Sequence, residues 1–382
     1  MKPDLTKPAL NENVPPEPVK PDEKASPDSI KRDEKALPDP VKPEEDNRRA
    51  KLSSSNFEFK TTLGTGTFAR VWLVKPTKEV RGRVSTSQVY ALKVLRKADI
   101  IRLKQCEHTK SERRILYCCR RHPFIAQLVY SWSDWNSLYL LMEYAPGGEL
   151  FTYLRRLVRF PVSTTQFYTA EITSAFCYLH RNGVVYRDLK PENVMIDAHG
   201  HIRLVDFGFS KEIGSTDETY TLCGTPEYIA PEILLSKGHG KAVDWWALGI
   251  FIFELSCGYP PFYDANTNKM YEKILKVDIH FPSSLDLPEA YKDIVRKLCT
   301  RDLTARLGNL RGGGNDVKKH PFFSDIDWDE LEKKTHPGPL VPDLENLEDA
   351  SYFEPYAPPE DRDPNDYTIA MYDKYENYFR DF

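Results

Sequence analysis

Two glycines followed by an apolar run, in LGTGTFARVWLV at residues 63–74, constrain the fold of this chain more than any other stretch. The G-x-G-x-x-A spacing suits a backbone that approaches phosphate oxygens closely, because glycine has no Cβ. Such a loop occurs either before a helix, in a dinucleotide-binding fold, or between two strands, as a cover over phosphates.

The residues after the loop distinguish these two folds. Ala69 is followed by a β-branched and aromatic run, and a second such run, VYALKVL, occupies residues 89–95. A dinucleotide fold also needs an acidic residue about 20 positions beyond the loop. Position 89 is Val, and the first acid after the second run is Asp99. The pattern therefore predicts strand, glycine loop, strand and strand, and it disfavours a dinucleotide site.

Composition and length indicate a soluble globular protein. A chain of 382 residues that is 40% apolar can bury a sizeable core in about two domains or lobes. The apolar stretches, such as ALGIFIFEL at 247–255, are shorter than the ~18 residues of a membrane span, and the N-terminus resembles no signal peptide. Seven cysteines without a C-x-x-C pair indicate a reducing compartment, so we predict the cytosol or the nucleus.

Charge divides the chain into three segments. Residues 1–55 carry a net charge of −1, residues 56–323 of +9 and residues 324–382 of −12. The last segment also contains ten aromatic residues, which solvated acidic tails lack. We therefore expect it to wrap around a basic core. No basic stripe with interleaved aromatics is visible, so nucleic acid is not a predicted partner.

The N-terminal segment, residues 1–55, has ten prolines, no glycine and no aromatic residue. It contains an 11-residue repeat, EPVKPDEKASP, DSIKRDEKALP and DPVKPEEDNRR, from 17 to 49. Proline in each unit excludes a continuous helix, so we predict a disordered tail, with a partner-docking role as the alternative.

Ordered sequence begins at Phe57. Strand patterns cluster at 57–95 and 138–145, with a helical segment at 106–119 between them. Longer helical patterns then dominate, for example at 164–180 and 244–258. A small strand-rich lobe should therefore precede a larger helical lobe.

A dense group of charged residues in VVYRDLKPENVMID, at 184–197, lies between two short apolar runs. Its R-D-x-x-x-x-N spacing is followed by DFG at 206–208 and APE at 230–232. Each residue alone has a structural explanation. Together, however, the chain resembles a eukaryotic protein kinase, because it has a glycine loop, a strand lysine, a helix glutamate and these motifs in this order.

The resemblance implies a Ser/Thr kinase with ATP and two Mg²⁺ ions as cofactors. Asp188 would accept the proton of the substrate hydroxyl, Lys190 would neutralise the γ-phosphate, and Thr225 would bridge these two residues. Lys93 would hold the α and β phosphates and pair with Glu112, while Asn193 and Asp206 would bind the metal ions.

The same resemblance implies a nucleotide site made of the glycine loop, an apolar slot and the connector between the lobes. The connector would present the Glu143 carbonyl and the Ala145 amide to adenine, and Glu149 would bind ribose. The full predicted set is Leu63, Gly64, Thr65, Gly66, Thr67, Phe68, Ala69, Arg70, Val71, Ala91, Lys93, Glu143, Ala145, Glu149, Met195 and Phe353.

Within the kinases, YTLCGTPEYIAPE at 220–232 and SKGHGKAVDWWALG at 236–249 resemble the cAMP-dependent catalytic subunits of the AGC group. DIIRLKQ at 99–105 points to their protein kinase X branch. The implied fold is α+β and bilobal, with a kinase domain at 56–323, divided into a small lobe and connector (57–145) and a large lobe (146–323). The C-terminal segment 324–382 would place Phe353 beside adenine and return Phe379 and Phe382 to the small lobe.

The resemblance further implies a basic R-R-x-S/T substrate preference and a phosphorylated activation-loop residue, Thr221, which would pair with Arg187. Glu149, Glu192, Glu227 and Glu254 would bind substrate arginines, and Leu222, Pro226 and Ile229 an apolar residue after the target hydroxyl. A cAMP-binding regulatory subunit and a pseudosubstrate inhibitor are the implied partners, besides protein substrates.

Some residues depart from the family pattern. Ala69 replaces the third glycine of the loop, and Tyr220 stands where the family has Trp at the regulatory-subunit contact. About seven extra residues in KPTKEVRGRVSTSQVY lengthen a connection between strands, and the tail phosphosite falls on Ala370, or on Thr368 with gaps.

Four further interpretations concern scaffolding and rival functions. We expect Glu232 to pair with Arg306, and Asp244 to act as a helix N-cap that steadies the catalytic loop. A pseudokinase scaffold should lack one of Lys93, Asp188 or Asp206, and all three are present. A simple ATPase would not need the four substrate carboxylates or Thr225.

Overall fold

The computed structural model describes residues 52–77, 84–214, 218–221, 223–359, 366–380 and 382. All of these belong to one compact unit, Ala36–Phe382. Residues 1–51 of the predicted disordered tail lie outside the described residues. Its last residues are folded, because Leu52 is buried in the cluster with Phe57 and Trp132 and a 3-10 turn begins at Ser54.

An antiparallel sheet forms the strand-rich lobe, with strand order β1-β2-β3-β5-β4. Its strands are β1 (Phe57–Thr65), β2 (Ala69–Pro76), β3 (Tyr90–Arg96), β4 (Leu128–Ser133) and β5 (Ser137–Glu143), and a 3-10 turn, η1 (Ser54–Asn56), precedes them. Helices α1 (Lys97–Arg102) and α2 (Cys106–Cys119) follow β3. The predicted strand, glycine loop, strand and strand are confirmed, and the predicted helix 106–119 has the bounds of α2.

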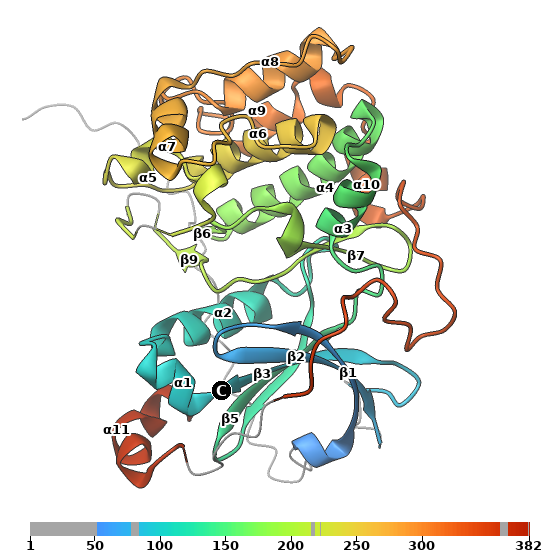
Figure 1. Ribbon diagram of the computed structural model, residues 1–382, viewed down its shortest axis with the longest axis vertical. Helices are drawn as coiled ribbons and strands as arrows, with labels where there is room; N and C mark the ends of the chain where they lie inside the picture. The colour runs from blue at the N-terminus through green and yellow to red at the C-terminus, as the bar shows by residue number, and fades with distance from the viewer. Residues whose placement is uncertain (1–51, 78–83, 215–217, 222, 360–365, 381) are drawn as a thin grey trace, which may run out of the picture. The chain divides into compact units, whose positions relative to one another are not determined.

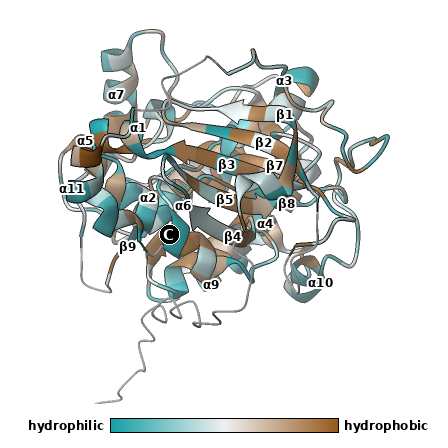
Figure 2. Cartoon of the chain, turned by 90° about the horizontal axis from the view of Figure 1, so that it is seen from below, coloured by the Kyte–Doolittle hydropathy of each residue, from teal (hydrophilic) through white to brown (hydrophobic). Residues whose placement is uncertain are grey.

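The sheet buries an apolar layer on each face. On one face, Trp132 stacks between Phe57, at a ring centroid distance of 5.7 Å, and Tyr139, at 4.8 Å. Alternate residues of β3 face opposite sides, as the two-residue period of a strand requires: Tyr90 and Leu92 pack with Trp132, while Ala91 packs with Leu63 and Leu73. Strands β2, β3 and β5 are coloured mainly as hydrophobic in Figure 2.

Helices make up most of the second lobe, above the sheet in Figure 1. They are α3 (Leu150–Leu157), α4 (Val162–Arg181), α5 (Pro231–Leu234), α6 (Ala242–Cys257), α7 (Thr267–Lys276), α8 (Glu289–Leu298), α9 (Gly314–Lys318) and α10 (Trp328–Lys333). Short strands and turns between α4 and α5 are β6 (Val184–Val185), η2 (Pro191–Asn193), β7 (Val194–Ile196), β8 (Ile202–Leu204), β9 (Lys211–Glu212) and η3 (Pro226–Tyr228), and η4 (Pro321–Phe323) precedes α10.

Helix α6 is the centre of this lobe, because every one of its residues is buried. Its apolar run ALGIFIFEL is too hydrophobic for a surface helix. Gly258 ends the helix with φ of 88° and donates its N–H to the Glu254 carbonyl at 2.7 Å, a left-handed C-terminal cap that favours glycine. Among the described residues, no helix is long and apolar enough to cross a membrane.

Arg306 and Glu232 form the predicted ion pair inside the helical lobe. Arg306 donates from Nη1 and Nη2 to the two carboxylate oxygens of Glu232, at 2.6 and 2.9 Å. Its Nη1 also donates to the Ala242 carbonyl, and Nε to the Thr300 carbonyl. The pair joins the start of α5 to the loop after α8.

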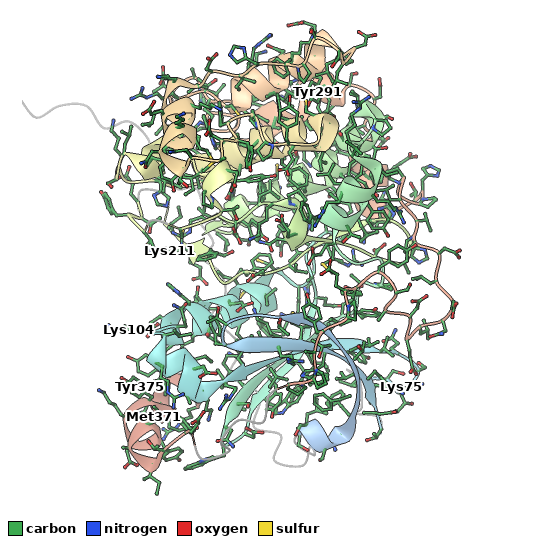
Figure 3. All side chains as sticks on the ribbon, in the orientation of Figure 1. Lys75, Lys104, Lys211, Tyr291, Met371 and Tyr375 are labelled. Atoms are coloured by element: carbon green, nitrogen blue, oxygen red, sulfur yellow. The ribbon has the colours of Figure 1, made fainter. Side chains whose placement is uncertain are left out.

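The acidic C-terminal segment returns to the small lobe, as its charge predicted. It runs beside the sheet to helix α11 (Ile369–Phe379), which packs on α2 (Figure 1). Lys75, near the end of β2 (Figure 3), pairs with Glu348 of this segment at 2.6 Å. Arg96 pairs with Asp366 at 2.6 Å, and Phe379 is buried, so charge and aromatic burial both fasten the segment.

Candidate active site

A pocket of about 450 Å³ lies between the sheet and the helical lobe. Fifteen of the sixteen residues predicted to bind nucleotide line it, together with Met142, Asn193 and Asp206. Arg70 is the exception: its Nη1 donates to Thr62 Oγ1 at 2.9 Å and to the Ala357 carbonyl at 3.1 Å. Because neighbouring strand residues face opposite ways, Arg70 points away from the pocket that Ala69 and Val71 line.

The glycine loop is the turn between β1 and β2 and covers one end of the pocket. The Gly66 N–H donates to the Ala69 carbonyl at 2.8 Å and closes the turn. A Cβ added at Gly64 would meet no atom within 4 Å, and one at Gly66 only the Ala69 carbonyl oxygen, at 3.7 Å. Internal packing therefore does not require these glycines. The room that they leave suits a ligand that approaches the backbone, as phosphate does.

Lys93 of β3 and Glu112 of α2 meet inside the pocket, with Nζ 2.6 Å from Oε1. The Asp206 carboxylate lies 4.0 Å from the same Nζ. Burial lowers the pKa of Lys93, but Glu112 and Asp206 outweigh it, so that the pKa lies above its ordinary value. The lysine is therefore a fixed positive charge, held where phosphates would lie.

Asp188 lies at the centre of a polar network. Its carboxylate accepts from Asn193 Nδ2 at 2.7 Å and from Thr225 Oγ1 at 3.2 Å, and Lys190 Nζ is 3.5 Å from it. Burial raises the pKa of Asp188, although Lys190 and Asn193 oppose the rise. A buried carboxylate of raised pKa that already accepts a hydrogen bond from a hydroxyl group, that of Thr225, suits a proton acceptor.

Asp244 holds the loop that carries Asp188. Its carboxylate accepts the backbone N–H groups of Tyr186 at 2.9 Å and Arg187 at 2.8 Å, and also bonds His180. The loop thereby keeps Arg187 at φ of 68°, a conformation that non-glycine residues rarely adopt. The predicted steadying role is thus confirmed. The predicted N-cap position is wrong, because Lys241 caps α6 and Asp244 is its third residue.

Asn193 and Asp206 form the donor set expected for a divalent cation. Both line the pocket, and the Asp206 carboxylate is half-exposed toward it. Asn193 directs its amide nitrogen to Asp188, which leaves its amide oxygen as the atom to offer a metal. Carboxylate and amide oxygens are the hard ligands that Mg²⁺ prefers, so these residues fit magnesium.

The four predicted substrate carboxylates form one acidic cluster, Glu149, Glu192, Glu227 and Glu254. Burial, Glu192 and Glu354 raise the pKa of Glu149. Burial raises the pKa of Glu254 to about 7, and the charges of Glu192 and Glu227 add to the rise. Glu254 also accepts a hydrogen bond from the Tyr228 hydroxyl. Carboxylates that repel one another in this way attract a guanidinium ligand.

The activation segment shows two residues that the sequence did not suggest, Thr219 and Lys211. Thr219 Oγ1 lies 3.5 Å from Thr221 Oγ1, and it accepts from Lys211 Nζ at 3.0 Å and Arg187 Nη1 at 3.5 Å. Lys211 lies on the side of the helical lobe that faces the sheet (Figure 3). Thr219, with Lys211 and Arg187 bonded to it, thus lies next to Thr221, and the pairing of Thr221 itself with Arg187 stays a prediction. No spacing rule in the sequence marks either residue.

Of the three residues predicted to bind an apolar substrate side chain, the structure describes two. Pro226 is exposed, and Ile229 is buried and lines a small cavity with Thr225; Leu222 lies outside the described residues. Phe353 of the acidic segment lines the nucleotide pocket and stacks on Tyr144 at 5.8 Å. The sequence missed a further set of lining residues, Gln105, His108, Thr109, Leu116, Ala126, Arg203, Val205, Gly208 and Phe209.

Comparison with known proteins identifies this arrangement. A family profile described as "Protein kinase domain" matches residues 57–323. The chain belongs to the protein kinase family. The predictions of a bilobal α+β kinase fold and of a serine/threonine protein kinase are thereby confirmed.

Relatives of this kinase include several proteins that are named as cAMP-dependent protein kinase catalytic subunits. It is 49% identical to "cAMP-dependent protein kinase catalytic subunit" of Dictyostelium discoideum, over 85% of this chain and 48% of that protein. It is also 49% identical to "cAMP-dependent protein kinase catalytic subunit PRKX" of Homo sapiens, over 80% of this chain and 82% of that protein. "cAMP-dependent protein kinase catalytic subunit 3" of Drosophila melanogaster is 46% identical, over 87% of this chain and 54% of that protein. The chain thus spans about half of the Dictyostelium and Drosophila relatives.

Proposed function

We propose that this kinase transfers the γ-phosphate of Mg-ATP to serine or threonine in R-R-x-S/T sequences. The acidic cluster carries this proposal. Glu192 follows Asp188 by four residues and Glu227 follows Thr225 by two, so the cluster adjoins the network around the proton acceptor. A guanidinium is the side-chain cation that matches several carboxylates through its five donors.

The residues of the site divide the work of phosphoryl transfer. Asp188 accepts the proton of the substrate hydroxyl, and Thr225, bonded to the same carboxylate, positions it. Lys190 and Lys93 place positive charge near the transferred group and the remaining phosphates. Two magnesium ions, which Asn193 and Asp206 would hold, neutralise phosphate charge when bound. Leu63, Ala91 and Met195 would contact adenine.

We also propose a cAMP-responsive regulatory subunit as partner, with a pseudosubstrate segment that occupies the acidic cluster. The names of the relatives support this partner. The cytosol and the nucleus are the proposed locations.

Radiolabel transfer from Mg-[γ-³²P]ATP to an R-R-x-S peptide tests the activity. Asp188→Asn should remove at least 99% of the transfer while the melting temperature stays within a few degrees. Asp264→Asn, in a carboxylate that pairs with Lys273 at the surface, is the matched control and should leave transfer unchanged. Transfer that persists in Asp188→Asn would contradict the assignment, and added regulatory subunit should inhibit transfer until cAMP is supplied.

A further inference from the structure

Arg203 of β8 lines the nucleotide pocket, although the sequence did not mark it as a site residue. It is the cross-strand partner of Met195 in the β7–β8 hairpin. Residues directly opposite each other in an antiparallel pair project from the same face, so Arg203 lies beside a predicted adenine contact. It therefore adds a positive charge next to the predicted adenine slot.

The guanidinium group of Arg203 holds the side chain of Glu143 through two hydrogen bonds. Nε donates to Glu143 Oε2 at 3.1 Å, and Nη2 donates to Glu143 Oε1 at 2.9 Å. Two such contacts give the pair a fixed geometry, because the planar guanidinium matches the two carboxylate oxygens. The side chains are 14% and 34% exposed, so solvent screens this pair less than a pair at the open surface.

Two further groups keep Arg203 itself in place. Its Nη1 donates to the Pro123 carbonyl, in the loop before β4, and its Nη2 lies 3.3 Å from Asp197 Oδ2. Asp197 also pairs with Lys334 at 3.1 Å. Because these contacts fix the guanidinium, Arg203 holds Glu143 in one position.

Glu143 is the last residue of β5, where the connector between the lobes begins. Its backbone N–H donates to the Gln127 carbonyl at 3.0 Å, and its own carbonyl is the predicted acceptor for the amino group of adenine. Since the side chain is held at both carboxylate oxygens, the backbone that carries this carbonyl is restricted as well.

We propose that Arg203 is a positioning residue for adenine, which holds Glu143 so that the Glu143 carbonyl accepts from the adenine amino group; this rests on the proposed function, in which ATP is the phosphate donor. Guanine carries an acceptor oxygen where adenine carries this amino donor. A carbonyl that is held in place therefore repels GTP, whereas a carbonyl that can move repels it less. Arg203 thus supports the affinity for ATP and the preference for ATP over GTP.

Steady-state transfer to an R-R-x-S peptide by the full-length kinase, with ATP and with GTP as donors, tests the proposal. Arg203→Met should raise KM for ATP about fivefold, while kcat and KM for the peptide change less than about twofold, because only binding of the nucleotide is weakened. The preference for ATP over GTP in kcat/KM should fall about tenfold. Arg203→Lys keeps the charge without the two parallel contacts, so it should restore part of the affinity.

Two further variants show whether Arg203 acts through Glu143. Glu143→Met keeps the backbone carbonyl and should raise KM for ATP as much as Arg203→Met does. The double variant should resemble either single variant to within about twofold, as a shared interaction requires. Asp197→Asn changes the other carboxylate beside Arg203 and is the matched control, which should leave KM for ATP unchanged. Isothermal titration calorimetry with Mg-ATP and the melting temperature of each variant distinguish weaker binding from loss of the fold.

Three results would overturn the proposal. They are an unchanged KM for ATP in Arg203→Met, additive effects of the Arg203 and Glu143 substitutions, and an increase in KM for ATP in Asp197→Asn as large as in Arg203→Met. In each of them the wild-type kinase phosphorylates the peptide, so the proposed function stands. A wild-type kinase that transfers no phosphate to the peptide would instead refute the proposed function, and calorimetry would still measure what Arg203 contributes to ATP binding.

Discussion

Two buried ion pairs, one in each lobe, have different surroundings. Arg306 and Glu232 bond through two parallel contacts at 2.6 and 2.9 Å, and the arginine side chain is fully buried. Lys93 and Glu112 make one contact at 2.6 Å, and the lysine borders the nucleotide pocket. The first pair has all its partners within the protein. The second keeps donor capacity for a ligand, since an ammonium group has three hydrogens.

This difference separates scaffolding from chemistry. A pair that the protein satisfies completely fixes two segments of chain, and its loss should appear in stability. A pair that borders a pocket holds a charged group in place for a ligand, so its loss should lower the activity. Four predictions follow this distinction, in order of decreasing effect.

Arg306→Met should lower the free energy of unfolding by about 3–5 kcal/mol, because it leaves the Glu232 carboxylate buried without its partner. Urea denaturation measures the change. The double variant Arg306→Met, Glu232→Met should recover much of the loss, since an apolar pair leaves no buried charge. If the single variant were as stable as the parent protein, the Arg306–Glu232 pair would not act as a scaffold.

Lys93→Met should reduce kcat/KM for peptide phosphorylation about 10²–10³-fold, as expected when a preorganised charge is lost from a reacting site. The free energy of unfolding should fall by less than in Arg306→Met, because water in the pocket can solvate Glu112. Steady-state kinetics and urea denaturation on one preparation give both values. If Lys93→Met lowered the free energy of unfolding as much as Arg306→Met does, both pairs would serve as scaffolds and the distinction between them would be wrong.

Glu254 is buried, as Arg306 and Glu232 are, but it belongs to the acidic cluster. With a pKa of about 7, its carboxyl group is mostly neutral at pH 6 and ionised at pH 8. An arginine ligand stays charged throughout, so KM for an R-R-x-S peptide should fall about tenfold as the pH rises from 6 to 8. Glu254→Gln should flatten this dependence, whereas an unaltered profile would place the titrating group elsewhere.

Lys97 and Glu376 form an intermediate pair, since Lys97 is buried but Glu376 is partly exposed at the surface of α11. Glu376→Gln should lower the free energy of unfolding by about 1 kcal/mol, because solvent screens the carboxylate. Thermal melting measures it, with Glu289→Gln, which loses an exposed partner of Arg296, as the control that should not change. A larger loss than in Arg306→Met would show that exposure does not rank these pairs.

Much of the fold and site could be predicted because their signals are local. The bounds of α2 follow from helical periodicity, and the glycine loop followed by a β-branched run identifies β1, β2 and the turn between them. The order of Lys93, Glu112, Asp188 and Asp206 along the chain identified the family before any geometry was known. Such signals persist in sequence because they depend on backbone preference and on the identity of a few reacting groups.

What the sequence alone determined is therefore the class of fold, the family and the groups that carry the chemistry. Only the tertiary structure decided which polar groups lie close to one another. It made Asp244 an acceptor for the backbone of the catalytic loop in place of a cap, and it turned Arg70 away from the pocket. It also brought Thr219 next to Thr221 and Lys211 next to Thr219, and four carboxylates into one cluster. These relations depend on distance, burial and repulsion between residues far apart in the chain, and no pattern along the chain encodes them.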